Sequence, residues 1–445
     1  MRRRDLLFTL TATAAFAQSK KPNIVFLLAD DLGYGDLACY GQKQILTPHL
    51  DALAAAGMRF IQAYAGATVC APSRCALFTG KHTGHGLIRG NMPTAVDLGL
   101  RPEDVTIAEV LKRAGYRSAI FGKWALGQLG STGYSLDKGF DESATFFSQT
   151  AAHNYYPEHI ANGRQPQLLK GNMGTQKSDY AADYFTGRAL EFVKKTTEPF
   201  FLYWPTTIPH ANNEMGRDTG NGMEVPSDVP YTQKPWPQVE KNFAAMVTRM
   251  DADFGKLMAL LKQTGRDRDT LILMSSDNGP HREGGHDPNF FDSNGPLRGI
   301  KRDLYEGGIR VPFIAYWPGK IQPGVSDQPI AFWDLLPTLA EIAGQPAPAG
   351  IDGISILPTL LGRGVQRQHD YFYWEFHERG FAQAIRQNQW KGVRKSGQAQ
   401  LELYDLSRDL GETNNLAAAH PDIAKKLLGL MSIARTESKE FPIQA

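Results

Sequence analysis

Four short polar clusters, each directly after an apolar run, contain residue types with which proteins bind ions and transfer protons. The clusters are Asp30-Asp31, Gly122-Lys123-Trp124, Ile208-Pro209-His210 and Ser276-Asp277-Asn278-Gly279. Two of them offer carboxylate and amide oxygens, a hard, all-oxygen set that favours Ca²⁺ or Mg²⁺ over zinc. The other two offer a lysine and a histidine, which can stabilise an anion or transfer a proton. An isolated Asp-Asp pair is usually a solvated turn, so these clusters form a site only if the fold brings them together.

The apolar runs before these clusters predict buried strands. They are short, rich in β-branched and aromatic residues, and span residues 23–28, 118–121, 199–204 and 270–274. Helical patterns lie between them, at residues 47–56, 106–114 and 244–261. Strands that alternate with helices predict an α/β sheet buried on both faces, and ligands of such sheets bind at the carboxyl ends of the strands. We therefore expect the four clusters to converge on one edge of the sheet.

The last quarter of the chain has a different pattern. After a helix at 334–343 and a Pro/Gly-rich stretch at 344–353, four short strands follow at 371–376, 381–386, 389–394 and 401–406, and a helix at 421–435 comes last. The pattern predicts a main domain at residues 18–355. It also predicts a small C-terminal unit at 356–445, with one antiparallel sheet and one packed helix.

The N-terminal residues predict export. Three arginines at positions 2–4 precede an apolar run at 6–16 that closes with small residues, as in a signal peptide covering residues 1–17. The paired arginines are compatible with the twin-arginine route. A run of about 11 residues is too short to span a bilayer, which needs about 20, so we expect a periplasmic or secreted protein with no stable membrane anchor. The net charge of +2 gives no sign of a nucleic-acid partner.

The most specific string is residues 70–80, Cys-Ala-Pro-Ser-Arg-Cys-Ala-Leu-Phe-Thr-Gly. It resembles, at every specified position, the signature C-x-P-S-R-x-x-L-x-T-G of the formylglycine-dependent sulfatases. The similarity extends from residue 22 to about 416, and the chain resembles arylsulfatases, N-acetylgalactosamine-6-sulfatases and a branch of bacterial polysaccharide sulfatases. Without that resemblance, Cys70 would be read as a buried structural cysteine in a turn before a helix.

The resemblance implies a fold and a reaction. The fold is alkaline-phosphatase-like, a mixed sheet sandwiched between helices, and the reaction is removal of sulfate from a sulfated glycan or an aryl sulfate. Cys70 is expected to be oxidised to formylglycine by a maturation enzyme that reads the motif. The hydrated aldehyde carries two hydroxyls on one carbon, of which one attacks sulfur and the other later expels the sulfate. The calcium ligands implied, with Mg²⁺ as second choice, are Asp30, Asp31, Cys70, Asp277 and Asn278.

The resemblance also implies catalytic cations. Arg74 is expected to orient the formylglycine hydrate, Lys123 and Lys301 to bind the sulfate, and a protonated His210 to act as general acid at the leaving oxygen. Lys301 lies just before Glu-Gly-Gly-Ile-Arg-Val-Pro at 306–312, which resembles a second sulfatase block.

One position departs from the family pattern. Ala125 stands where many sulfatases have the histidine of G-K-W-H-L-G, which helps to deprotonate the hydrate. The replacement for that base stays open among His153, His85 and Asp277. Two other readings of the chain also remain: a phosphatase, which would need histidine ligands for two zinc ions, and a non-catalytic glycan-binding protein, which Ala125 alone supports.

Substrate recognition is weakly encoded. We expect His153, His286 and Asp287 to bind sugar hydroxyls, whereas Trp204 and Trp236 are compatible with either sugar stacking or ordinary packing. If Cys70 is converted, two cysteines remain, and the sequence leaves open whether Cys39 and Cys75 pair.

Overall fold

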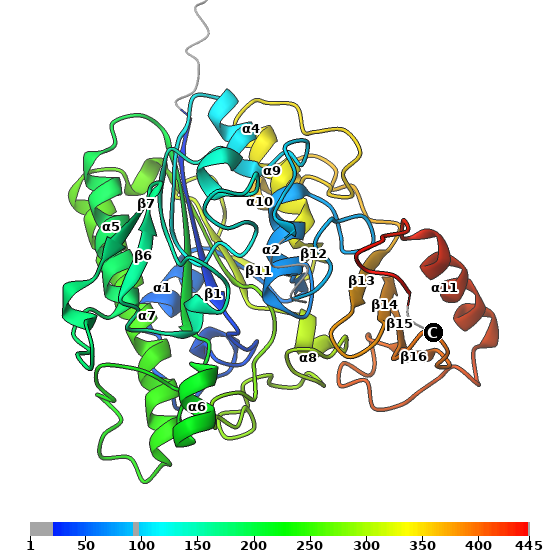
Figure 1. The fold of residues 1–445 in the computed structure, drawn as a ribbon. Coiled ribbons are helices and arrows are strands. Elements are labelled where there is room, and N and C mark those ends of the chain that lie inside the picture. Colours follow the sequence, from blue (N-terminus) through cyan, green and yellow to red (C-terminus); the bar gives the residue numbers. More distant parts are fainter. Residues whose placement is uncertain (1–20, 92–97, 444–445) are drawn as a thin grey trace, which may run out of the picture.

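The computed structural model describes residues 21–91 and 98–443 (Figure 1). The expected signal peptide at residues 1–17 lies outside the described residues. None of the helices formed by the described residues combines the length and the apolar character needed to cross a membrane.

A mixed sheet of ten strands forms the centre of the protein. Its four inner strands are β9 (Thr270–Ser276), β1 (Asn23–Asp30), β8 (Phe200–Pro209) and β4 (Arg117–Gly122), which are consecutive neighbours and run parallel. Every residue of β1, β8 and β9 is buried. The four predicted strands are therefore confirmed, and their carboxyl ends lie at the same edge of the sheet.

Shorter strands complete the sheet on both sides. Beyond β4 lie β5 (Glu142–Thr145), which is parallel to it, and the antiparallel pair β6 (His159–Asn162) and β7 (Gln165–Leu168). Beyond β9 lie β10 (Phe313–Tyr316), β2 (Met58–Phe60) and β11 (Gly324–Ser326). Because β10 is antiparallel to β9, the sheet is mixed, as expected. A separate two-stranded sheet joins β3 (Ala63–Tyr64) and β12 (Ile330–Ala331).

Helices cover both faces of the large sheet (Figure 1). Alternate residues of β1 enter two different apolar clusters: Val25 and Leu27 face one, whereas Ile24 and Phe26 face the other, as the two-residue repeat of a strand requires. The first cluster includes α1 (Pro48–Ala56), α5 (Ala181–Lys195) and α7 (Gln238–Gln263). The second includes α2 (Cys70–Thr79), α4 (Ile107–Arg113), α9 (Leu335–Ile342) and α10 (Leu357–Leu361). The sandwich architecture is thus confirmed.

The three cysteines are free thiols. Cys39 packs against the first cluster and Cys75 belongs to the second, so the two lie on opposite faces of the sheet. The pairing that the sequence left open is therefore absent from the structure.

The C-terminal residues form the expected small unit. Strands β13 (Phe372–Phe376), β14 (Ala382–Gln387), β15 (Trp390–Arg394) and β16 (Glu402–Asp405) pair antiparallel in that order, and α11 (Pro421–Ile433) packs on β14 and β15 (Figure 1). The domain boundary at residue 355 stays a prediction.

A buried ion cluster joins this unit to the main sheet domain. The Lys391 ammonium on β15 lies 2.9 Å from a carboxylate oxygen of Glu306, in the short helix α8 (Glu306–Ile309), and 2.9 Å from one of Glu412. All three side chains are fully buried. A buried carboxylate requires a positively charged partner, which Lys391 provides for Glu412 and shares with Arg310 for Glu306.

Replacing Lys391 by methionine is expected to lower the free energy of unfolding by about 3 to 5 kcal/mol, because buried Glu412 loses its counterion and buried Glu306 keeps only its ion pair with Arg310. Urea titration followed by fluorescence measures the change. The matched control is Lys195→Met, since Lys195 is 71% exposed and pairs on the surface with Glu191, where ion pairs stabilise little. Equal unfolding curves for the two variants would show that the buried cluster does not stabilise the fold.

Candidate active site

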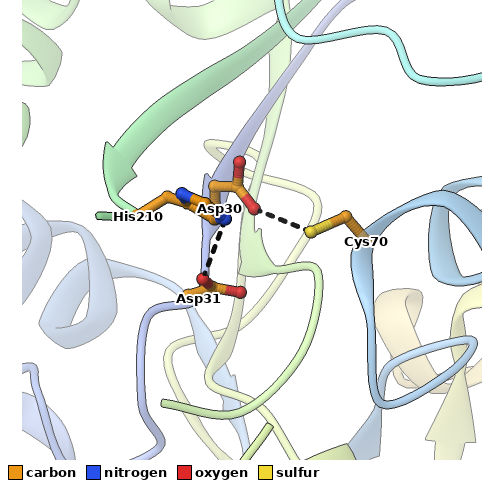
Figure 2. A group of neighbouring side chains, drawn as sticks. All are labelled: Asp30, Asp31, Cys70 and His210. Atoms are coloured by element: carbon orange, nitrogen blue, oxygen red, sulfur yellow. Dashed lines mark hydrogen bonds and ion pairs between the residues drawn. The ribbon is translucent and has the colours of Figure 1, made fainter. Parts of the chain in front are cut away.

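The four polar clusters meet at the carboxyl edge of the sheet. Figure 2 shows Cys70 pointing from α2 towards Asp30, with Asp31 and His210 facing each other beside it. One potential ligand atom from each of these four side chains lies within 4.8 Å of the others, and all four residues are buried. The convergence expected from the strand pattern is therefore present in the structure.

Cys70 is the first residue of α2, a helix buried along its whole length. Its Sγ lies 3.2 Å from Oδ1 of Asp30 and 3.4 Å from Nζ of Lys123. Burial, and then the negative charge of Asp30, raise the pKa of the Cys70 thiol well above its ordinary value. An unmodified cysteine here is consequently a protonated thiol and a poor nucleophile.

The acidic residues form a crowded set of oxygens. Asn278 donates from Nδ2 to Asp31 Oδ1 at 2.7 Å, and Asp277 Oδ1 accepts from the Asp31 backbone N–H at 3.1 Å. Burial, and then the charge of Asp30, raise the pKa of Asp277 to about 7. The side-chain oxygen of Asn278 is buried and has no hydrogen-bond partner.

These residues fit a hard divalent cation. Three buried carboxylates repel one another, and a buried amide oxygen without a partner is costly unless something binds it. A bound cation would reduce the repulsion between the carboxylates and would give the amide oxygen a partner. An all-oxygen donor set suits calcium or magnesium.

Arg74 binds the acidic residues of the site. Its Nε and Nη2 donate to Oδ2 of Asp277 at 3.0 and 2.8 Å, and its Nη1 donates to the backbone carbonyl of Lys123. Its side chain is completely buried and lies 3.7 Å from Asp30. In this arrangement the guanidinium fixes Asp277 and the end of β4.

Lys123 and Lys301 flank the site on two sides. The Lys123 ammonium is 2.7 Å from Asp30 Oδ2, and the Lys301 ammonium is 2.8 Å from Asp31 Oδ2. Burial alone would lower the pKa of Lys301, but the charges of Asp31 and Glu283 raise it well above its ordinary value. Both lysines are therefore buried cations beside Cys70.

His210 is neutral in this environment. Its Nδ1 lies 2.7 Å from the Ala211 carbonyl, to which it donates, so Nε2 is left to accept from Lys301 Nζ at 3.3 Å. Burial, and then the charge of Lys301, lower the pKa of His210 to about 3. Lys301 thus offers a proton to Nε2 of His210, and the role of His210 as general acid stays a prediction.

A pocket of about 180 Å³ opens onto these groups. Its lining residues are Cys70, Asn91, Gln149, Thr150, His153, His210, Asn213, Lys301, Arg302 and Glu378. The ring of His153 stacks on that of His210, with centroids 4.9 Å apart and planes 16° apart. The structure thus brings His153 to the pocket, whereas His85 pairs with Asp352 instead. Ala125 leaves no titratable side chain at its own position.

Three charged residues at this pocket have no counterpart in the sequence-based expectations. Glu283 Oε2 lies 3.0 Å from Lys301 Nζ and 3.7 Å from His210 Nε2. Its other carboxylate oxygen accepts from Arg302, which in turn contacts Glu378 at 3.0 Å. In the sequence, Glu283 lies five residues after Asn278 and Arg302 directly follows Lys301. Closeness in sequence to these expected site residues is the only feature that could have identified them.

The other two expected sugar-binding residues do not line the pocket. His286 is buried, stacks on Phe243 with centroids 3.8 Å apart, and pairs through Nδ1 with Glu240 at 2.7 Å. Asp287 forms an exposed ion pair with Arg282. The two tryptophans pack as well: Trp204 of β8 lies in the first apolar cluster, and Trp236 stacks on Tyr231. The structure shows packing or surface contacts for these residues.

Comparison with known proteins gives a consistent result. The sulfatase family model matches residues 22–345, and a model for the C-terminal part of N-sulphoglucosamine sulphohydrolase matches residues 299–435. Human arylsulfatase A is 33% identical over 95% of this chain and 89% of its own. N-acetylgalactosamine-6-O-sulfatase of Bacteroides thetaiotaomicron is 29% identical over 94% of each chain.

The fold is shared with solved structures. Ps i-CgsB, crystallised in complex with k-i-k-neocarrahexaose, superposes with a TM-score of 0.80 at 26% identity and covers 96% of each chain. Because the family model covers most of the chain and curated sulfatases align over nearly its full length, the protein belongs to the sulfatase family and is a sulfatase.

Proposed function

We propose that the protein hydrolyses sulfate esters of glycans or aryl alcohols with Cys70 converted to formylglycine. The observation that carries this proposal is the position of Cys70: it faces Asp30 and stands beside Lys123, at the edge of a pocket that also contains Lys301. Buried cations on two sides of one reactive position are suited to a tetrahedral anion, because they are already oriented and are not screened by water.

The modification supplies what the thiol lacks. A hydrated aldehyde offers an attacking hydroxyl and a second hydroxyl through which sulfate is expelled. The unmodified thiol, with its raised pKa, offers neither. Lys123 and Lys301 would hold the sulfate oxygens, and Arg74 would keep Asp277 in place without contacting the substrate.

We assign the metal as Ca²⁺, held by the oxygens of Asp30, Asp31, Asp277 and Asn278 and by the modified residue 70. When bound, it would polarise a sulfate oxygen and acidify the attacking hydroxyl. Mg²⁺ is the second choice.

The leaving alcohol needs a proton, and the structure suggests its source. Lys301 donates to Nε2 of neutral His210, so the two side chains form one hydrogen-bonded acid. A substrate oxygen placed in the pocket can receive a proton from Lys301 directly or through His210. His153 and Asp277 remain candidates for the base that the position of Ala125 lacks.

The relatives suggest sulfated glycans as substrates, with periplasmic or secreted action after removal of a signal peptide. Two of the relatives are named for activity on aryl sulfates and on N-acetylgalactosamine 6-sulfate, and these two activities define the substrates that we propose. A screen of desulfation against defined sulfated mono- and disaccharides would identify the sugar and the position.

Intact-mass analysis of protein co-expressed with a formylglycine-generating enzyme tests the proposal. The peptide containing residue 70 is expected to be lighter by about 18 Da, the difference between CH₂SH and CHO. The peptide containing Cys39 is the internal control and should keep its thiol mass. An unchanged peptide 70 in a preparation that hydrolyses aryl sulfates would contradict formylglycine catalysis.

Replacing Glu283 by glutamine is expected to reduce kcat about 10- to 100-fold, because the charge that holds Lys301 against His210 is lost and small displacements of an acid are costly. Steady-state kinetics with 4-nitrophenyl sulfate measure the effect. The control is Glu103→Gln, which removes an exposed charge beside Arg101. Equal kcat for both variants would mean that Glu283 does not position the lysine.

A further inference from the structure

A second cavity, which we call the outer cleft, adjoins the catalytic pocket. It has a volume of about 710 Å³ and is lined by parts of segments 148–158, 172–177 and 212–219. Thr150 lines both cavities. His153 of the catalytic pocket pairs through Nδ1 with Glu214 of the outer cleft, at 3.2 Å. The two side chains form the wall between the cavities.

The sizes of the two cavities suggest different occupants. The catalytic pocket, at about 180 Å³, has room for the sulfate group and little beyond the ring that bears it. The outer cleft is several times larger and has space for further sugar units. A chain of sugars whose sulfated unit enters the catalytic pocket would therefore extend over the outer cleft.

The outer cleft offers hydrogen-bonding groups to a sugar. The Asp218 carboxylate and the Thr150 and Thr175 hydroxyls form no hydrogen bond or ion pair with the described part of the chain. The half-buried ring of Tyr156 adds an apolar surface. Free polar groups beside an aromatic ring are typical of carbohydrate sites, because sugars present both hydroxyls and C–H faces.

The two cavities are lined by different charged side chains. The catalytic pocket is lined by two cations, Lys301 and Arg302, and one carboxylate, Glu378, whereas the outer cleft is lined by three carboxylates, those of Glu158, Glu214 and Asp218.

One lysine, Lys177, lines the cleft, but its charge is compensated. Its ammonium contacts the carboxylate of Glu224, which is buried, and lies 5.5 Å above the ring of Tyr156. Glu214 in turn lies 3.8 Å from Arg217. Glu158 and Asp218 form no ion pair with the described part of the chain, so they leave the cleft negative, and it would repel a second anionic group at short range.

We infer that the outer cleft binds an uncharged sugar linked to the sulfated one, and that it selects against a neighbouring sugar that carries its own sulfate or carboxylate. The inference rests on the proposed function, since it takes the catalytic pocket as the place of the scissile sulfate. It makes Glu158 and Asp218 specificity-determining residues.

Calorimetric titration of the full-length, calcium-loaded Cys70→Ala protein tests the inference without turnover. The probes are N-acetylgalactosamine 6-sulfate, the same sugar linked to galactose, and the same sugar linked to galactose 6-sulfate. The galactose disaccharide is expected to bind about tenfold more tightly than the monosaccharide. The doubly sulfated one is expected to bind about tenfold more weakly than the neutral disaccharide, and added salt should narrow that difference.

Charge-neutralising variants test whether the carboxylates of the outer cleft cause this difference in affinity. Glu158→Gln combined with Asp218→Asn is expected to bring the two disaccharides to within about twofold of each other. Glu191→Gln, on the outer surface of α5, is the matched control and should keep the tenfold discrimination.

Three results would each overturn the inference. They are equal affinities of the unaltered cleft for the three probes, no measurable binding of any probe, and a tenfold preference for the neutral disaccharide that persists in the double variant. Hydrolysis is measured separately, with 4-nitrophenyl sulfate and the matured protein. If that assay fails while the order of affinities holds, the proposed function falls and the cleft assignment stands.

Discussion

Replacing Cys70 by alanine is expected to lower kcat/KM for 4-nitrophenyl sulfate by at least about 10⁴-fold, because covalent catalysis at that position is lost together with its metal contact. The fold should survive, since the side chain that is removed is small and starts the helix. Kinetics on matured wild-type and variant proteins, with circular dichroism of both, measure the effect.

Cys75→Ala is the matched control. It changes a cysteine of the same buried helix that faces the apolar cluster and not the pocket, so it should retain activity within about threefold. Activity of the Cys70 variant equal to that of the control would exclude the proposed nucleophile. No turnover by the wild-type protein, together with binding of sulfated sugars, would indicate a glycan-binding protein, and turnover of 4-nitrophenyl phosphate alone would indicate a phosphatase.

Removal of divalent metal by EGTA is expected to abolish hydrolysis, with at least about a 10³-fold loss of rate, and added calcium should restore it. The physical reason is the cluster of Asp30, Asp31 and Asp277, whose carboxylates pair with Lys123, Lys301 and Arg74. Without a cation these lysines stay paired with aspartates and are less available to the sulfate.

Metal analysis before and after chelation, combined with rates at defined free calcium and magnesium, measures the dependence. Asn278→Ala provides a second test, because it removes a buried amide oxygen of the acidic cluster that has no hydrogen-bond partner. It should raise the calcium concentration needed for half-maximal rate about tenfold. Full activity in metal-free protein, or restoration by zinc alone, would overturn the calcium assignment.

The inner part of the fold was predictable because its strands are continuous apolar runs. β1 and β9 are buried on both faces, and such strands are recognisable in a sequence without knowledge of their partners. The outer strands β2 and β11 have three residues each and contain polar positions, so nothing local distinguishes them from loops. Their existence depends on β10 lying beside β9 in the opposite direction.

The site was predictable where residues follow strands and not where loops supply them. Asp30 and His210 occur at strand ends, which meet in any parallel sheet. Glu378, by contrast, comes from the small C-terminal unit, and only tertiary packing brings it to Arg302. His286 was expected at the substrate as a loop residue near the predicted site, but the ring of Phe243 and the carboxylate of Glu240 hold it in the interior.

The burial of Cys70 has a consequence for when the modification can take place. The residue is 1% exposed and begins a helix that lies entirely inside the protein. The proposed conversion therefore requires access to residue 70 before this helix is enclosed in the folded protein. Conversion would therefore compete in time with folding, and every molecule that folds first would keep an inert thiol permanently. The specific activity of a preparation would then depend mainly on the ratio between the rate of conversion and the rate of folding in the producing cell.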